Sequence, residues 1–280
     1  IGTAQFGLNY GINNNKGQLS ETEIFKILDF SHERGLITLD TAPGYGKSEE
    51  IIGKYFLNNK DKKFQIISKL NINNNGFKKS LISSLEKLKI EYIDTLLFHS
   101  FDQYTYYKNR LNEFNRKFRK NLYGKIGVSL YTRKEVEDVL LDDEIDLIQA
   151  PFNLIDNESI RGELYRKIKK SGKELHTRSV FLQGIFFKPF NELPLKLRPL
   201  IKPLNKINKL CYEHKISKNE LSICYCISKD YVDKVLIGVD GLKHLDENYN
   251  SQFKTLNKLI YKKIDALTFS KTKLLNPSLW

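Results

Sequence analysis

The feature that most restricts how this chain can fold is the repeated alternation of short apolar runs with longer charged segments. Eight runs of strand length recur along the 280 residues, separated by segments whose apolar residues repeat at helical spacing. This alternation predicts βα units with parallel strands. The predicted strands are residues 1–5, 36–40, 64–69, 92–99, 125–130, 145–150, 174–178 and 234–238.

The first predicted helix covers residues 21–34, where Ser20 and Glu23 have the spacing of a capping box and Gly35 ends the helical period. Residues 242–267 predict two further helices, followed by a tail that ends at Trp280. The remaining helical segments are residues 48–57, 77–88, 107–122, 133–141, 159–171 and a longer tract over 200–229.

Eight parallel strands that alternate with helices predict an α/β fold, a single (β/α)8 TIM barrel with an extra C-terminal helix and tail. A doubly wound open sheet is the rival fold, but it needs a Gly-x-Gly-x-x-Gly turn after an early strand, and the chain has none. No linker rich in Pro, Gly or Ser divides the chain, so we expect one domain over residues 1–280. Because the opening Ile1-Gly2-Thr3 reads as the inside of a strand, we expect that N-terminal residues are missing before it.

The charge balance is strongly basic, with 46 Lys and Arg against 33 Asp and Glu and a formal net charge of +13. Such a charge raises the hypothesis of nucleic-acid binding. The lysines are spread over the whole chain and form no patch, so we do not expect a nucleic-acid partner. Anionic small molecules, such as a phosphorylated cofactor, suit a basic protein equally well.

The sequence offers no sign of a membrane or secretory protein. No run approaches the roughly 18 uninterrupted apolar residues of a membrane span, and no charged-then-apolar leader resembles a signal peptide. We therefore expect a cytoplasmic location and no membrane partner. The cysteines are three, and Cys224 and Cys226 point different ways in an apolar segment, so neither a disulfide framework nor a metal site is expected.

Polar residues end three successive predicted strands. In a TIM barrel the active site lies at the carboxyl ends of the strands. Asp40, Lys69 and His99 end these strands, and Tyr45 follows Asp40 in a Gly-Tyr-Gly turn. A buried carboxylate needs a positive partner, so we predict that Asp40 pairs with Lys69 and that Lys69 stabilises the phenolate of Tyr45. His99 would hydrogen-bond a carbonyl oxygen beside the tyrosine. Such a site protonates a carbonyl oxygen while a cofactor supplies the reducing equivalents.

Each of these residues also has an ordinary structural interpretation. Asp40 could open a turn against which Tyr45 packs, Lys69 could be a solvated strand end, and His99 could be a hydrogen-bonded histidine without a catalytic role. Their joint position at three successive strand ends favours the catalytic interpretation.

The same residues lie in a series of motifs that resembles the aldo-keto reductase superfamily. Each motif is weak by itself, but their order is kept along nearly the whole chain, and the ordered set is specific. The motifs are Gly2-Thr3-x-x-x-Gly7 with Tyr10-Gly11, Leu39-Asp40-Thr41-Ala42-x-x-Tyr45-Gly46-x-Ser48-Glu49, Ser68-Lys69, Leu97-Phe98-His99, Lys125-Ile126-Gly127-Val128-Ser129, Gln149-x-Pro151-x-Asn153, Arg178-Ser179-x-x-x-x-Gly184 and the loop from Gly238 to Asn248.

The resemblance implies a (β/α)8 barrel that binds NADPH in an extended conformation without a Rossmann fold. It places the family's catalytic tetrad on Asp40, Tyr45, Lys69 and His99, with Tyr45 as the general acid. It also implies a cofactor site, with its nicotinamide carboxamide end at Ser129 and Gln149. The implied cofactor-binding residues are Gly2, Thr3, Ser129, Gln149, Arg178, Gly238, Val239, Asp240, His244, Glu247 and Asn248.

Two departures from the family pattern bear on the cofactor. Arg178 stands where many relatives stack a tyrosine on the nicotinamide, so a charged guanidinium plane replaces an aromatic ring. Near the expected adenosine 2′-phosphate, Asp240 would repel that phosphate, while Lys243 or His244 would attract it. NADPH is expected from the family habit, and NADH stays open.

The function expected from these residues is reduction of a small-molecule aldehyde or ketone with NAD(P)H. A sugar or nucleotide-sugar carbonyl is a hypothesis that rests on the basic charge and on a general likeness to bacterial sugar-pathway reductases. The alternative is a cofactor-binding regulatory subunit with the same fold and little turnover. The aromatic loop 99–107 and the segment 181–194 are predicted to line or cover the substrate pocket, with ordinary packing as the alternative. The sequence predicts no oligomeric state.

Overall fold

The computed structural model describes residues 1–14, 17–71 and 76–280, in which helices and strands alternate. The strands pair in the order in which they occur along the chain, and each defined register is parallel. The predicted α/β class is therefore confirmed. Among the described helices, none has the length and apolar character needed to cross a lipid bilayer.

The strands are β1 Thr38–Asp40, β2 Gln65–Leu70, β3 Ile93–Phe98, β4 Tyr123–Ser129, β5 Leu147–Pro151, β6 Glu174–Arg178 and β7 Lys234–Val235. The α-helices are α1 Ala4–Gly7, α2 Glu21–Glu33, α3 Ser48–Asn58, α4 Gly76–Leu88, α5 Phe101–Tyr107, α6 Leu111–Phe118, α7 Arg133–Leu140, α8 Glu158–Lys170, α9 Ile201–His214, α10 Lys218–Ile227, α11 Leu242–Ser251 and α12 Lys258–Asp265. Short 3-10 helices lie at Lys108–Arg110, Leu182–Phe187, Phe190–Glu192, Leu195–Leu200, Thr272–Leu275 and Pro277–Leu279.

The described residues form two compact units, each assembled from separate stretches of chain. The first contains the described parts of residues 1–10, 16–149 and 237–245, and the second contains those of 11–15, 150–236 and 246–280. Strands β1 to β4 belong to the first unit and β6 and β7 to the second, while β5 runs from one into the other. That the chain is a single domain stays a prediction.

The strand predicted at residues 1–5 is wrong as an extended element. Only Gly2 forms β-bridges, one to Asp40 and one to Gly238, and both are parallel. The Thr3 N–H and the Thr3 hydroxyl donate to the Asp40 carbonyl oxygen, at 2.9 and 3.0 Å, and the chain then turns into α1. Gly2 therefore joins the end of β1 to the segment that follows β7, with one residue in place of a strand.

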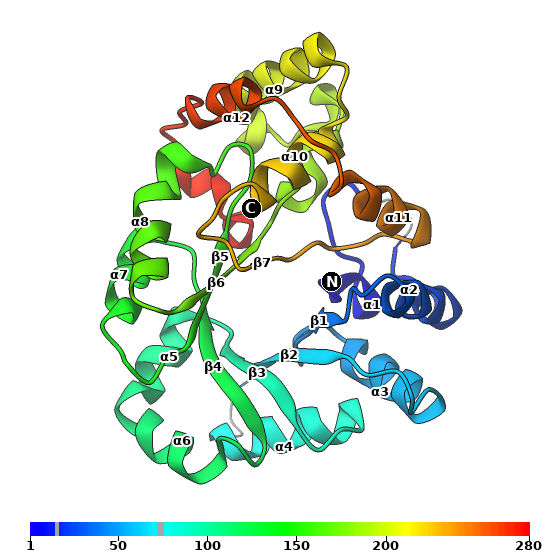
Figure 1. Ribbon diagram of the computed structural model, residues 1–280, viewed down its shortest axis with the longest axis vertical. Coiled ribbons are helices and arrows are strands. Elements are labelled where there is room, and N and C mark those ends of the chain that lie inside the picture. Colours follow the sequence, from blue (N-terminus) through cyan, green and yellow to red (C-terminus); the bar gives the residue numbers. More distant parts are fainter. Residues whose placement is uncertain (15–16, 72–75) are drawn as a thin grey trace. The chain divides into compact units, whose positions relative to one another are not determined.

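Successive side chains of β2 lie in two different apolar clusters of the first unit. Ile66 packs in a cluster with residues of α2 and α3, and Ile67 packs in a second cluster with residues of β3 and β5. Because successive residues of a strand point to opposite faces, Ser68 lies on the helix-covered face and Lys69 on the other. In Figure 1, α3 and α4 lie side by side, and α4 contacts both α3 and β2.

In the second unit, β6 pairs with β7 and four buried aromatic rings pack together. The ring of Phe152 stacks on that of Tyr225 with centroids 5.4 Å apart. It also contacts the rings of Tyr165 and Tyr231 at 5.8 and 6.1 Å. These contacts give the second unit an aromatic core of its own.

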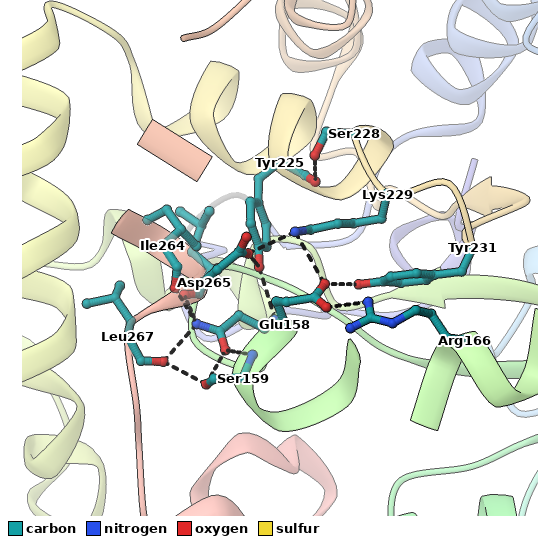
Figure 2. Close-up of polar contacts among 12 residues, drawn as sticks. Glu158, Ser159, Arg166, Tyr225, Ser228, Lys229, Tyr231, Ile264, Asp265 and Leu267 are labelled. Carbon is teal, nitrogen blue, oxygen red and sulfur yellow. Dashed lines mark hydrogen bonds and ion pairs between the residues drawn. The ribbon is translucent and has the colours of Figure 1, made fainter. Parts of the chain in front are cut away.

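A partly buried lysine, Lys229, links three segments of the second unit, as Figure 2 shows. Lys229 Nζ lies 2.8 Å from Asp265 Oδ1, 3.3 Å from Glu158 Oε2 and 4.6 Å from the centre of the Tyr225 ring. The Tyr225 hydroxyl donates to Asp265, and the Tyr231 hydroxyl donates to Glu158. The start of α8, the segment that follows α10 and the end of α12 are thereby connected.

Residues 99–107, expected as a loop, contain helix α5. Ser100 caps this helix by accepting a hydrogen bond from the Gln103 N–H. Tyr104 and Tyr107 are buried, so ordinary packing describes these two rings. The predicted helix 107–122 is therefore wrong at its start, and its end comes earlier, at Phe118.

Candidate active site

Asp40 and Lys69 form a buried ion pair at the carboxyl ends of β1 and β2. Lys69 Nζ lies 2.5 Å from Asp40 Oδ1, and the two side chains are 1% and 6% exposed. Parallel pairing places Asp40 opposite Ile67, so Lys69 lies two residues beyond the last paired position of β1. The Lys69 ammonium also donates to the carbonyl oxygen of Thr41, at 3.0 Å.

Both oxygens of the Asp40 carboxylate have a donor. Gln149, buried in the middle of β5, donates from Nε2 to Asp40 Oδ2 at 2.8 Å. Burial alone would lower the pKa of Lys69, but the negative charge of Asp40, the neighbouring Tyr45 side chain and the hydrogen bond to Asp40 raise this pKa above its usual range. Lys69 is therefore held as a cation where water does not reach it.

Tyr45 lies against the ion pair from the loop that follows β1. The Lys69 ammonium is 4.9 Å from the centre of the Tyr45 ring. His99, directly after β3, meets Tyr45 edge to face, with ring centroids 6.1 Å apart and an angle of 85° between the rings. The structure thus brings together the four side chains of the predicted tetrad.

Two glycines allow the Tyr45 loop to lie directly against the start of the chain. A Cβ atom at Gly7 would lie 1.7 Å from the Tyr45 carbonyl oxygen. A Cβ atom at Gly46, where φ is +56°, would lie 2.3 Å from the carbonyl oxygen of Gly7. Only glycine permits this approach of two backbones. The Ser48 hydroxyl, 2.9 Å from Thr3 Oγ1, holds the far end of the loop.

The convergence of these side chains agrees with a match to a known family. The model of the aldo/keto reductase family matches residues 1–268. The chain belongs to the aldo/keto reductase family. It is therefore an oxidoreductase of a family that uses NAD(P)H and acts on carbonyl compounds.

Curated aldo/keto reductases are similar over most of the chain. L-galactose dehydrogenase from Arabidopsis thaliana is 23% identical over 253 residues, which cover 83% of this chain and 78% of that protein. Aldo-keto reductase str7 from Strobilurus tenacellus is 22% identical over 255 residues, with coverages of 82% and 76%.

Solved aldo/keto reductase structures have the same fold. The holo form of AKR11C1 from Bacillus halodurans superposes with a TM-score of 0.75 at 18% identity, covering 98% of this chain and 94% of that one. An aldo/keto reductase from Brucella melitensis gives a TM-score of 0.66 at 19% identity, with coverages of 89% and 90%. The predicted (β/α)8 barrel class is therefore confirmed.

Most of the predicted cofactor residues of this aldo/keto reductase lie in the first unit. Ser129 and Gln149 are paired in register on β4 and β5 and are both buried. The Gln149 amide is bonded to Asp40, so this side chain supports the tetrad itself, which the sequence did not indicate. The cofactor residues in this unit are Gly2, Thr3, Ser129, Gln149, Gly238, Val239, Asp240 and His244.

The Asp240 carboxylate is held in place by a residue that sequence reasoning missed. Gln5 donates from Nε2 to Asp240 Oδ1 at 3.0 Å, and His244 Nδ1 lies 3.9 Å from Asp240 Oδ2. A Cβ atom at Gly238 would lie 2.9 Å from Gln5 Nε2, so glycine leaves room for the amide. Gln5 lies in the opening Gly2-Thr3 motif, but its partner is 235 residues away, and no local pattern indicates the contact.

The remaining predicted cofactor residues, Arg178, Glu247 and Asn248, lie in the second unit. Arg178 ends β6, with Nη1 3.4 Å from the Ser179 hydroxyl oxygen. Asn248 is buried, and its Oδ1 has no hydrogen-bond partner among the described residues. A buried acceptor in this state fits a ligand that brings a donor, such as the amino group of adenine. The cofactor roles of all these residues stay predictions.

Sequence reasoning also left Glu49 without a role. This acid is 1% exposed in the first turn of α3, and its Oε1 accepts a hydrogen bond from the Ser68 hydroxyl at 2.7 Å. A signal for its burial exists, because the buried residues Ile52 and Gly53 follow it at helical spacings of three and four.

Proposed function

We propose that the protein reduces an aldehyde or ketone, with Tyr45 as the general acid. The observation that carries the proposal is the meeting of a phenol with a buried ammonium–carboxylate pair and an imidazole. A phenol beside a fixed cation can give up its proton at low cost, which is what protonation of a carbonyl oxygen requires.

In this proposal Tyr45 transfers its hydroxyl proton to the carbonyl oxygen of the substrate as negative charge develops there. Lys69, in contact with the phenol, stabilises the phenolate that remains, and Asp40 keeps Lys69 charged and in place. His99, whose ring meets that of Tyr45, hydrogen-bonds the same carbonyl oxygen. When bound, NAD(P)H supplies the hydride to the carbonyl carbon.

The cofactor we propose is NADPH, because the family habit favours it, with NADH as the second candidate. Ser129 and Gln149 would hold the nicotinamide amide. The adenosine end would lie at the segment from Gly238 to His244. Asp240 disfavours a 2′-phosphate in this region and the adjacent Lys243 and His244 favour one.

The substrate class we propose is a sugar or nucleotide-sugar carbonyl. One relative is named L-galactose dehydrogenase, and the net charge of +13 suits phosphate-bearing substrates. A cytoplasmic location is part of the proposal and is supported by the three cysteines, none of which is disulfide-bonded.

The proposal is tested by two measurements on the purified protein. Quenching of protein fluorescence during titration with NADPH and with NADH measures binding of each cofactor. Consumption of the reduced cofactor is then followed with a panel of aldose sugars, nucleotide sugars and small apolar aldehydes. Reduction of at least one carbonyl supports the proposal, and a protein that binds neither cofactor and reduces nothing contradicts it. A preference for small apolar aldehydes would contradict the sugar class alone.

A further inference from the structure

A buried carboxyl group outside the tetrad, that of Glu49, lies on the opposite face of β2 from Lys69. It belongs to the first turn of α3, four residues after Tyr45. The Ser68 hydroxyl donates to Glu49 Oε1 at 2.7 Å. Because Ser68 directly precedes Lys69, this bond joins the helix that follows the Tyr45 loop to the strand that carries Lys69.

The surroundings of Glu49 favour an uncharged carboxyl group. Its Oε2 is buried without a hydrogen-bond partner among the described residues. Burial raises the pKa of Glu49, against the opposing effects of Ser68, Ser84 and the charges of Lys87 and Lys69. An apolar residue of similar size would avoid the cost of burying this group. The bond to Ser68 is therefore the feature that distinguishes Glu49 from simple packing.

We propose that Glu49 is a positioning residue for the catalytic centre. Through its hydrogen bond with Ser68, Glu49 holds the Tyr45 loop against β2 and so sets the position of the Tyr45 hydroxyl relative to Lys69. The expected effect on kcat rests on the proposed function, whereas the expected effect on the order of the Tyr45 loop does not. On the other face of β2, Lys69 bonds Asp40 and the Thr41 carbonyl oxygen, which lie at the start of the Tyr45 loop. The Lys69 contacts thus hold the start of the Tyr45 loop and the Glu49–Ser68 bond holds its end, from opposite faces of β2.

Four single variants distinguish the contribution of the Glu49–Ser68 hydrogen bond from those of the Glu49 charge and of side-chain packing. Ser68→Ala removes the donor, and Glu49→Leu removes the acceptor while filling its space. Glu49→Gln keeps an acceptor oxygen without the carboxyl group. Ser84→Ala is the matched control, because Ser84 lies near the same carboxyl group but belongs to α4.

Each variant is measured in two ways. Steady-state kinetics use NADPH, or NADH if the protein prefers it, with 4-nitrobenzaldehyde as the carbonyl probe. Hydrogen–deuterium exchange of residues 42–48 in the cofactor-free protein reports the order of the Tyr45 loop without any turnover.

For Ser68→Ala and Glu49→Leu we expect kcat to fall about ten- to hundredfold, because misplacement of a catalytic group by about 1 Å can cost about 10²-fold. We expect KM and the cofactor Kd to stay within about twofold of the wild type, and exchange over 42–48 to become faster. Combining the two substitutions should lower kcat no further than either one, because both break the same bond. Glu49→Gln and Ser84→Ala should match the wild type in kcat and in exchange.

The proposal is overturned if Ser68→Ala and Glu49→Leu alter the rate of hydrogen–deuterium exchange of residues 42–48 no more than Ser84→Ala does. It is also overturned if Glu49→Gln loses as much kcat as Glu49→Leu, which would assign the effect to charge, or if KM rises while kcat stays unchanged. A wild-type protein that reduces no carbonyl compound would contradict the proposed function. The exchange measurement would still decide whether Glu49 holds the loop.

Discussion

Lys69 Nζ and Asp40 Oδ1 lie 2.5 Å apart, and neither side chain is more than 6% exposed. Removing one partner of such a pair leaves an uncompensated buried charge, whereas removing both leaves none. This difference makes the centre of the site testable by stability alone, before any substrate is known.

Lys69→Met should lower the free energy of unfolding by about 3–5 kcal/mol, because Asp40 is left buried without its cation. Adding Asp40→Asn to Lys69→Met should restore part of this loss. Urea unfolding at neutral pH measures all of these values. Lys54→Met is the control, since its pair with Glu21 is 60% and 45% exposed and should matter by less than about 1 kcal/mol. Equal effects of Lys69→Met and Lys54→Met would contradict the assignment of a buried pair.

Gly46→Ala should abolish the packing of the Tyr45 loop against the start of the chain. The added Cβ atom would lie 2.3 Å from the Gly7 carbonyl oxygen, in addition to the strain of a positive φ. Gly35→Ala is a matched control, with φ of +73° and no heavy atom within 4 Å of the added Cβ. The control should cost about 1–2 kcal/mol, from the left-handed backbone alone. Gly46→Ala should cost clearly more in urea unfolding and lose most turnover; equal costs would show that the close approach is unimportant.

Glu49 should make the stability of the protein depend on pH. Because burial raises its pKa in the folded state, its contribution is fully present below the unfolded value of 4.5 and is lost as the pH rises through the folded value. Glu49→Gln cannot ionise, so its stability relative to the wild type should increase as the pH rises from about 4.5 toward neutrality. Urea unfolding of both proteins over this range measures the difference. A difference independent of pH would contradict the raised pKa.

Asp240→Asn should raise the affinity for NADPH relative to NADH if the 2′-phosphate lies near this carboxylate. Removal of one negative charge at partly solvated contact distance is worth about 1 kcal/mol, or about fivefold in the ratio of the two Kd values. Parallel fluorescence titrations with both cofactors measure this ratio. Asp61→Asn, at an exposed position of the first unit, should leave it unchanged. An unchanged ratio in Asp240→Asn would place the 2′-phosphate elsewhere.

The strand ends of the tetrad could be predicted because a polar residue that closes an apolar run marks where a strand meets its loop. Asp40 ends β1, Lys69 is the next-to-last residue of β2 and His99 directly follows β3. The error at residues 1–5 has a physical cause, since Thr3 bonds the Asp40 carbonyl oxygen and turns the chain into a helix. A local apolar pattern does not distinguish this turn from a strand.

Contacts between distant residues could not be predicted. Gln149 donates to Asp40 across 109 positions, and Gln5 donates to Asp240 across 235. Such contacts depend on how the whole sheet is ordered, which hydrophobic periodicity does not encode. The buried state of Glu49 was missed for a different reason, because a charged residue in the first turn of a helix usually lies at the surface.

The central claim, that Tyr45 is the proton donor of a carbonyl reductase, is tested most directly by Tyr45→Phe. The variant keeps the ring but loses the hydroxyl, and fluorescence titration should give cofactor Kd values close to those of the wild type. With a carbonyl that the wild type reduces, kcat should fall by about 10²–10⁴, the usual contribution of a general acid. A variant that binds the cofactor and still reduces the carbonyl at nearly the wild-type rate would contradict the account.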